Sequence, residues 1–178
     1  MQLLKNREEL LKHLNLEGKK CAEIGVFKGE FSQLILAQNP KTLYLIDPWE
    51  HQSIEIYPDD HANRVLHDFD TIYKELQSTL GKDERVKLIK GYSYFEAPKF
   101  EDNSLDFVYI DAIHTFESCY CDILSWYHKV KPEGWLCGHD YTGYFTGVKS
   151  AVTAFCRITK KEVNIMTIED WGSWGLKK

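Results

Sequence analysis

Hydrophobic residues recur along this chain in two patterns, which predict strands separated by helices. Short apolar, β-rich runs predict strands at 21–26, 42–46, 85–90, 105–110 and 135–138. Apolar residues three or four positions apart predict helices at 6–15, 30–38, 61–80, 116–127 and 148–158. Two short segments, 161–168 and 171–177, are joined tightly enough to form antiparallel strands.

This alternation is typical of right-handed βαβ units, whose parallel sheet is covered by helices on both faces. We therefore expect an α/β protein with a three-layer αβα, Rossmann-like sheet of about seven strands, mostly parallel, with a terminal antiparallel hairpin. Residues 1–178 contain no internal repeat, low-complexity tract or linker, so a single domain is predicted. Residues 50–60 are polar and irregular, which indicates a loop near the site.

The strand predicted at 105–110 ends in Asp111 and, three residues later, His114. In open α/β sheets, ligands bind in the crevice outside the carboxyl ends of the strands. The strand at 42–46 ends in Asp47, and the strand at 135–138 is followed by Asp140, so acids from three strands should meet there. The alternative is a solvated acid with a surface histidine, and His114 could instead cap the helix that follows.

Composition narrows the class of ligand. The net charge of -5 and the sequence pI of about 5.8 provide no basic surface for a nucleic-acid backbone. No apolar run approaches the length of a membrane span, and the first residues lack the apolar centre of a signal peptide, so we expect a cytoplasmic protein without membrane contact. The five cysteines form no C-x-x-C pair, which argues against a disulfide framework or a zinc ribbon.

The segment Glu23-Ile24-Gly25-Val26-Phe27-Lys28-Gly29 lies where a dinucleotide-binding fingerprint would lie, between a strand and a helix. Phe27 replaces the middle glycine, which in that fingerprint lets the backbone approach a pyrophosphate. Glu23 also disfavours a phosphate, because like charges repel. A cofactor without phosphate therefore fits better than a dinucleotide, and an ordinary tight turn is the structural alternative.

Asp47 follows the glycines at about the twenty-residue distance at which an acid hydrogen-bonds ribose hydroxyls. Ser93 follows the next predicted strand, where an adenine ring would lie. Glu23, Asp47 and Asp111 should then converge on one crevice, and such an acidic set suits a ligand that carries a ribose, an ammonium and a sulfonium. S-adenosylmethionine has all three groups. Turn formation is the alternative role of Asp47 and Ser93.

Taken in order, these motifs resemble the class I S-adenosylmethionine-dependent methyltransferases, in particular the small family that includes macrolide-sugar O-methyltransferases and cephalosporin hydroxylase-like proteins. The segments that carry the resemblance are 22–29 with Ser32, 46–49, 91–93, 109–117, 138–141, 147–152 and 173–174. The resemblance implies a seven-stranded sheet with a reversed final hairpin and a methyl acceptor above the strand ends. The cofactor contacts that it implies are Glu23, Gly25, Val26, Gly29, Ser32, Asp47, Trp49, Ser93 and Asp111.

The sugar-modifying members of that family hold a metal with an acid after the fourth strand and an Asp-Asp pair after the fifth. Asp111 matches the first position, whereas the pair reads His139-Asp140 here. Because one of the three ligands would be an imidazole, this site would suit Mn²⁺ or Fe²⁺ better than Mg²⁺. The alternative is that His139 and Asp140 shape the floor of the pocket by hydrogen bonds.

The sequence thus predicts an S-adenosylmethionine-dependent methyltransferase (EC 2.1.1.-) acting on a hydroxyl of a small molecule or sugar. His114 is the predicted general base, since its ordinary pKa allows it to accept a proton at neutral pH, and Asp111 would orient the acceptor. Residues 50–60 and 141–145 should supply most of the acceptor pocket. The alternatives are a nucleotide-dependent oxidoreductase of the same fold, disfavoured by Phe27, and a non-catalytic cofactor-binding accessory protein.

Overall fold

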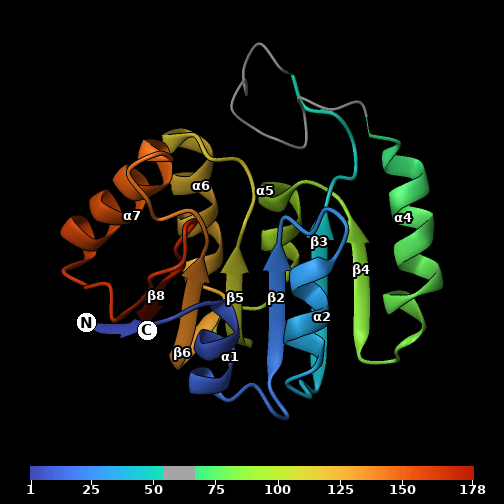
Figure 1. Cartoon of the computed structure of the whole chain (residues 1–178), viewed down its shortest axis with the longest axis horizontal. Coiled ribbons are helices and arrows are strands. Elements are labelled where there is room, and N and C mark those ends of the chain that lie inside the picture. Colours follow the sequence, from blue (N-terminus) through green and yellow to red (C-terminus); the bar gives the residue numbers. More distant parts are fainter. Residues whose placement is uncertain (54–66) are drawn as a thin grey trace.

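The computed structural model describes residues 1–53 and 67–178, which form one twisted sheet between two layers of helices (Figure 1). The strands are β1 (Gln2–Leu4), β2 (Lys20–Ile24), β3 (Thr42–Asp47), β4 (Val86–Lys90), β5 (Leu105–Ile110), β6 (Val130–Gly138), β7 (Ile165–Thr167) and β8 (Trp174–Lys177). The helices are α1 (Arg7–Leu14), α2 (Glu30–Leu36), α4 (Phe69–Ser78), α5 (Ser93–Glu96), α6 (Phe116–Tyr127) and α7 (Thr146–Thr159), with 3-10 helices η1 (Leu80–Lys82) and η2 (Ala97–Lys99).

The sheet confirms the predicted Rossmann-like architecture. The strand order is β1-β7-β8-β6-β5-β2-β3-β4, and β8 runs antiparallel to both of its neighbours while the other pairs are parallel. The order reverses beside β2, so the crevice above β2 is the topological switch point at which ligands bind in such sheets. The carboxyl ends of β2, β4, β5 and β6 point to the same edge in Figure 1.

Helix α5 and the two 3-10 helices were not predicted, and three further elements differ from the sequence predictions. Strand β1 was not predicted, because three residues are too few to show an alternating pattern, and it pairs with β7 from Gln2↔Ile165 onward. Strand β6 begins at Val130 rather than at 135, since a register shift against β5 lets 131–134 bulge within the strand. Helix α4 begins at Phe69 with Asp68 as its N-cap, and 61–66 of the predicted helix, like 54–60 of the predicted loop, lie outside the described residues.

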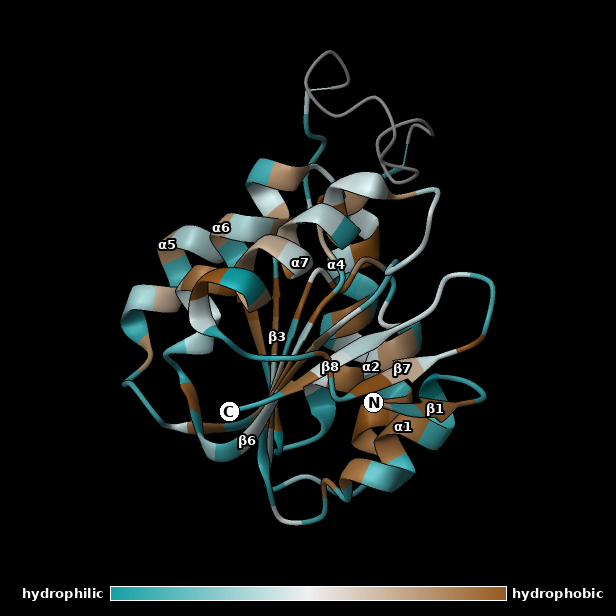
Figure 2. Cartoon of the chain, turned by 90° about the vertical axis from the view of Figure 1, so that its left-hand side faces the viewer, coloured by the Kyte–Doolittle hydropathy of each residue, from teal (hydrophilic) through white to brown (hydrophobic). Residues whose placement is uncertain are grey.

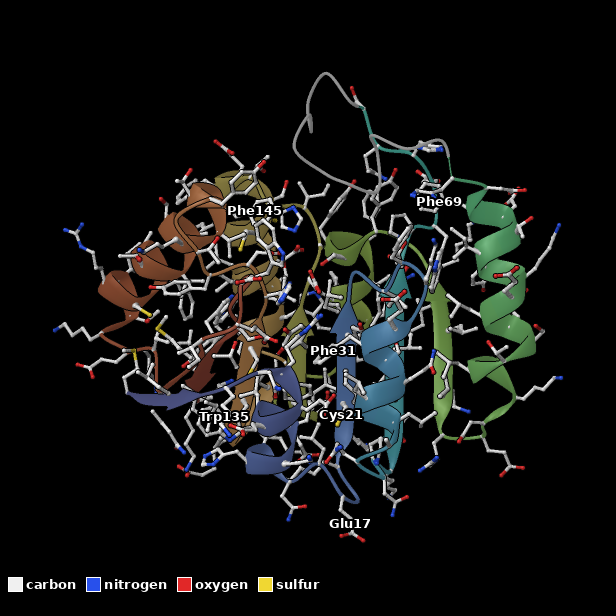
Figure 3. The ribbon with its side chains drawn as sticks, in the orientation of Figure 1. Glu17, Cys21, Phe31, Phe69, Trp135 and Phe145 are labelled. Atoms are coloured by element: carbon white, nitrogen blue, oxygen red, sulfur yellow. The ribbon has the colours of Figure 1, made fainter. Side chains whose placement is uncertain are left out.

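Alternation along the central strands fills two hydrophobic layers. Phe107 and Tyr109 of β5 face the layer that contains α1, α2 and α4, while Val108 and Ile110 face the layer that contains α6 and α7. All four are buried, and each such side chain contributes about 1.5 to 3 kcal/mol to folding. Figure 2 shows the apolar residues concentrated on the strands and on the helix faces next to them, and Figure 3 shows Phe31 within the first layer.

A local hydrogen bond fixes the start of helix α1. Asn6 caps α1 by accepting a hydrogen bond from the Glu9 backbone at 3.0 Å, which starts the helix directly after β1. This cap places Arg7 in the first turn of α1, next to the carboxyl edge of the sheet. None of the helices within the described residues combines the length and apolar character needed to cross a bilayer.

Candidate active site

A cavity of about 350 Å³ opens at the carboxyl edge of the sheet, above the switch point. Its wall is formed by the residues that follow β2, β3, β4 and β5, together with parts of α1, α2 and α6. The predicted site residues that line it are Glu23, Gly25, Val26, Asp47, Ser93, Asp111 and His114. The structure therefore brings together most of the residues that the sequence assigned to cofactor and catalysis.

The turn after β2 is shaped by close packing against β5. Gly25 has a φ of 84°, and a Cβ at this position would lie 2.0 Å from the Asp111 carbonyl oxygen, so only glycine fits. One oxygen of the Asp47 carboxylate accepts hydrogen bonds from the backbone N–H groups of Val26 and Phe27 at 2.8 and 3.0 Å. Asp47 thus fixes the turn in the position where it faces the cavity.

Three residues predicted as cofactor contacts, Gly29, Ser32 and Trp49, are not among the residues that line the cavity. Ser32 donates a hydrogen bond to the buried Glu23 carboxyl, whose pKa burial raises well above its ordinary value. The Trp49 indole is buried and donates to the Phe27 carbonyl oxygen at 2.9 Å. Gly29 is the N-cap of α2, with a φ of 75°, and packs against the Leu76 side chain. These residues support the wall, because their side chains or backbone conformation are needed by neighbouring elements.

Ser93 belongs to a short hydrogen-bonded chain on the opposite side of the cavity. The Trp126 indole N–H donates to the Ser93 hydroxyl oxygen at 2.8 Å, and the Ser93 hydroxyl donates to Oδ1 of Asp122. Asp122 is buried on α6 and lines the cavity. Its burial, only partly opposed by the Ser93 hydrogen bond, raises its pKa to about 7.

Asp122 was missed by the sequence analysis. It occupies the helical stripe of α6 that also contains the buried Cys119, Ile123 and Trp126. An acid within an otherwise apolar stripe is an unusual placement, and this was the one signal in the sequence that could have drawn attention to it. The motifs used for prediction lie at strand ends, and a residue in the second turn of a helix lies outside them.

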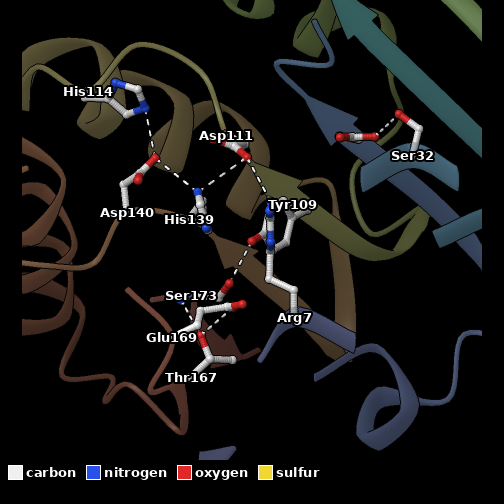
Figure 4. Close-up of polar contacts among 11 residues, drawn as sticks. Arg7, Ser32, Tyr109, Asp111, His114, His139, Asp140, Thr167, Glu169 and Ser173 are labelled. Atoms are coloured by element: carbon white, nitrogen blue, oxygen red, sulfur yellow. Dashed lines mark hydrogen bonds and ion pairs between the residues drawn. The ribbon is translucent and has the colours of Figure 1, made fainter. Parts of the chain in front are cut away.

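Acidic and basic side chains alternate in a chain of contacts from His114 to Arg7 (Figure 4). His114 Nε2 contacts Asp140 Oδ2 at 2.9 Å, and the same oxygen lies 3.2 Å from His139 Nδ1. His139 Nδ1 lies 3.6 Å from Asp111 Oδ2, which lies 3.6 Å from the Arg7 guanidinium. Two carboxylates are thus placed between three basic groups.

The pKa values in this chain follow from the contacts. Burial opposes charge on His139, but hydrogen bonds to Asp111 and Asp140 prevail and raise its pKa to about 9. Burial would raise the pKa of Asp140, yet hydrogen bonds from His114 and His139 lower it to about 2. Both groups are therefore charged at neutral pH in this arrangement.

The three predicted metal ligands are neighbours in space. Asp111, His139 and Asp140 each present one ligand atom, and these atoms lie within 4.8 Å of one another. Among residues 1–53 and 67–178, this is the one group of histidine, cysteine and acidic side chains close enough to hold an ion. Two carboxylate oxygens and one imidazole nitrogen are a donor set that fits Mn²⁺ or Fe²⁺.

The alternative role of His114 as a helix cap is wrong. Thr115 is the N-cap of α6, and its hydroxyl accepts from the Ser118 backbone at 3.2 Å. The His114 ring instead faces the cavity and packs against Phe145, with ring centroids 4.3 Å apart. Its position on the cavity wall follows from the turn that joins β5 to the Thr115 cap.

An aromatic cluster adjoins His114. Phe145 contacts Tyr144 and Trp171, with ring centroids 5.0 and 5.4 Å away, and Tyr144 and Trp171 are 66% and 46% exposed. Tyr144 and Phe145 belong to the predicted acceptor segment 141–145. Trp171, which comes from the connection between β7 and β8, was not predicted, because its distance from His114 in sequence gives no sign of the contact.

The fold is Rossmann-like, and a cavity lies at its switch point, where ligands bind in such sheets. A family profile for the methyltransferase domain matches residues 22–141, which is more than half of the chain, and the chain belongs to this family. The protein is thus an S-adenosylmethionine-dependent methyltransferase. No curated protein sequence matches the chain.

Solved structures share the fold at low sequence identity. The O-methyltransferase NovP is 17% identical, with 97% of this chain and 79% of NovP covered at a TM-score of 0.73. A Staphylococcus aureus protein described as a caffeoyl-CoA O-methyltransferase is 15% identical, with 96% and 80% covered at 0.67. A Streptococcus mutans protein described as a methyltransferase, solved with SAH, is 13% identical, with 98% and 99% covered at 0.65.

Proposed function

We propose that this enzyme methylates a hydroxyl oxygen of a small molecule or sugar. The acceptor oxygen attacks the methyl carbon of S-adenosylmethionine, an O–CH₃ bond forms as the S–CH₃ bond breaks, and the hydroxyl proton passes to His114. S-adenosylhomocysteine is the leaving group. NovP and the Staphylococcus aureus protein are described as O-methyltransferases, which supports an oxygen acceptor.

The observation that carries this proposal is that one cavity is lined by both halves of the predicted site. Gly25 and Asp47 line it from the cofactor side, and Asp111 and His114 line it from the side next to the aromatic cluster. A methyl donor and an acceptor held in one cavity can be aligned for in-line transfer, which converts a bimolecular step into an intramolecular one. Asp47 would accept from the ribose hydroxyls in addition to its backbone hydrogen bonds.

His114 is proposed as the general base, with Asp140 as its positioning residue. The 2.9 Å contact between His114 Nε2 and Asp140 Oδ2 orients the ring. A carboxylate hydrogen-bonded to the ring fixes its orientation and stabilises the imidazolium that forms when the ring accepts a proton. Asp111 lies on the same side of the cavity and would orient the acceptor hydroxyl. Phe145, which packs on the His114 ring, keeps the imidazole on the cavity wall.

A divalent ion would be held by Asp111, His139 and Asp140, because their ligand atoms already lie within 4.8 Å of one another. Such an ion would bind an acceptor hydroxyl and lower its pKa. The Arg7 guanidinium, 3.6 Å from Asp111, would keep that carboxylate in place.

Isothermal titration calorimetry and an acceptor panel test the proposed function. The wild-type protein should bind S-adenosylhomocysteine, and S-adenosylmethionine should be consumed with hydroxylated sugars or aromatic compounds as acceptors. A thermal-shift panel with NAD as the comparison ligand separates the two cofactor classes, since a ligand that binds the folded state raises the melting temperature. Stabilisation by NAD alone would contradict the proposal.

Manganese binding tests the metal assignment without relying on activity. Titration of the wild-type protein with Mn²⁺, followed by electron paramagnetic resonance, should show one bound ion, and Asp140→Asn should weaken its binding. Asp102→Asn, at an exposed acid near the opposite edge of the sheet, is the matched control. No bound ion at millimolar Mn²⁺, together with full activity in chelator, would make His114 the sole source of hydroxyl activation.

A further inference from the structure

Asp122 is a buried acid on the cavity wall that the proposed methyl transfer does not use. It is 6% exposed, yet it lines the cavity, so the small exposed part of its side chain belongs to the ligand space. One carboxylate oxygen, Oδ1, accepts the hydrogen bond from Ser93. The other oxygen, Oδ2, has no hydrogen-bond partner among the described residues, and it is not fully buried. Oδ2 is therefore the oxygen available to a ligand.

A buried acid of this kind is costly unless it serves a ligand. A buried carboxylate loses much of the solvation that favours its charged form, which is why its pKa rises. The surrounding side chains are predominantly apolar: Cys119, Ile123 and Trp126 lie on the same stripe of α6. A serine or alanine would fill this position at lower cost. A ligand with an N–H donor opposite Oδ2 would satisfy the acid and offset its burial.

We propose that Asp122 Oδ2 accepts a hydrogen bond from the exocyclic amine of the cofactor's adenine and thereby selects adenine over a 6-oxo purine. This inference rests on the proposed placement of the cofactor, with its ribose at Asp47 and its base beside Ser93. Both Ser93 and Asp122 line the same cavity as Asp47. A 6-oxo purine would present a carbonyl oxygen to Oδ2, and two acceptors facing each other repel.

The hydrogen bonds around Asp122 fix which of its oxygens faces the cavity. The Trp126 indole can only donate, so the Ser93 hydroxyl accepts from it and directs its own hydrogen toward Oδ1. In Asp122→Asn, the amide oxygen must occupy the Oδ1 position to accept that hydrogen. The amide nitrogen must then occupy the Oδ2 position and face the cavity as a donor. The substitution exchanges an acceptor for a donor with almost no change in shape, so a change in ligand preference can be attributed to the hydrogen bond.

The test compares S-adenosylhomocysteine with S-inosylhomocysteine, which differs in carrying oxygen at purine position 6. Affinities are measured by calorimetry at pH 8, where the Asp122 carboxyl is ionised. The wild-type protein should prefer the adenine ligand by about tenfold or more, the effect of one charge-assisted hydrogen bond. Asp122→Asn should lose this preference or reverse it, because its amide N–H can donate to the 6-oxo group.

Asp102→Asn is the matched control, since it makes the same substitution at an exposed acid remote from the cavity, and it should retain the wild-type preference. Equal affinity of the wild-type protein for the two ligands would overturn the inference without any variant. An Asp122→Asn protein that folds and keeps the wild-type ratio would also overturn it. Failure of the wild-type protein to bind either ligand would instead contradict the proposed cofactor placement, so the two failures are distinguishable.

Discussion

The proposed cofactor side and the proposed acceptor side of the cavity are built from interactions of different range. On the cofactor side, Asp47 contacts Val26 and Phe27 across a single βαβ unit. On the acceptor side, Arg7 contacts Asp111 although more than a hundred residues separate them in sequence. The first kind of site depends on one local unit, whereas the second exists only when distant elements are assembled.

The two sides also differ in how their charges are balanced. Asp47 is satisfied by backbone N–H groups, which are fixed once the turn forms. Asp111 and Asp140 instead contact the side chains of Arg7, His114 and His139, so this network joins the first turn of α1 to the segments that follow β5 and β6. Backbone donors make a rigid site that suits a ligand of fixed structure. In a network of side chains, a single substitution can change which ligand is bound. A shared methyl donor and a particular acceptor suit these two constructions.

The largest effect should come from breaking the acceptor side at His114. His114→Ala removes the proposed proton acceptor, so turnover should fall by about 10²- to 10⁴-fold while the affinity for S-adenosylhomocysteine stays nearly unchanged. Steady-state kinetics and calorimetry measure the two quantities. His128→Ala, at an exposed histidine at the other end of α6, is the control and should retain turnover. Normal turnover at saturation in His114→Ala would remove the general-base role.

Breaking the cofactor side at Asp47 should give the next largest effect. Asp47→Ala removes both the proposed ribose contact and the acceptor for the Val26 and Phe27 backbone, so binding of S-adenosylhomocysteine should weaken by about 1.5 to 3 kcal/mol. The melting temperature should fall as well, since the turn loses its support. Calorimetry with unchanged affinity would exclude Asp47 from the ribose site.

The pH dependence of stability sharpens the comparison at Asp122. Its pKa is about 7 in the folded state and about 3.8 when unfolded, so the folded protein holds the proton that the unfolded chain releases. This acid should therefore lower stability as the pH rises from about 4 to 7, and no further above that. Asp122→Asn removes the decline, so the variant should gain roughly 1 to 2 kcal/mol over the wild type at pH 8 and little at pH 4. Urea titrations at the two pH values measure the difference, and an equal gain at both would contradict the raised pKa.

The smallest effect should follow from removing the Thr115 cap. This change tests the start of α6 separately from the proposed catalytic role of His114. Thr115→Ala leaves the Ser118 N–H without its partner, which should cost about 1 kcal/mol of stability. Thr115→Ser keeps a hydroxyl at the same position and should retain most of that stability. Denaturant unfolding of both variants provides the measurement. A cap loss seen in His114→Ala but not in Thr115→Ala would reverse the assignment.

The same contrast explains what the sequence could predict. Gly25, Asp47, Asp111 and the His139-Asp140 pair directly follow apolar strands, and parallel strand ends meet at one edge, so their convergence follows from a local pattern. Arg7, Trp171 and Asp122 reach the site from a helix start, a loop between strands and the second turn of a helix. Their places depend on tertiary packing, which leaves no spacing rule in the sequence.

Ser32 and Trp49 show a second limit of motif-based prediction. Ser32 and Trp49 lie within the cofactor motifs, but Ser32 faces Glu23 and Trp49 faces the Phe27 carbonyl, behind the wall. A motif records which residues are needed at a turn and does not distinguish those that contact a ligand from those that hold the backbone. The β6 bulge is a similar case, since residues 131–134, which precede the strand predicted at 135–138, are an irregular part of a longer strand.

The pairing of β1 with β7 has a consequence for the order of folding. Gln2 pairs with Ile165, and the same N-terminal segment presents Arg7 to Asp111. Closing so long a loop costs entropy that no local contact offsets, and contacts of high sequence separation form late. During synthesis, the first residues of this segment must wait for β7 to emerge from the ribosome before they can pair. The acceptor side should therefore be completed in the last step of folding, after the local turn around Asp47 has formed.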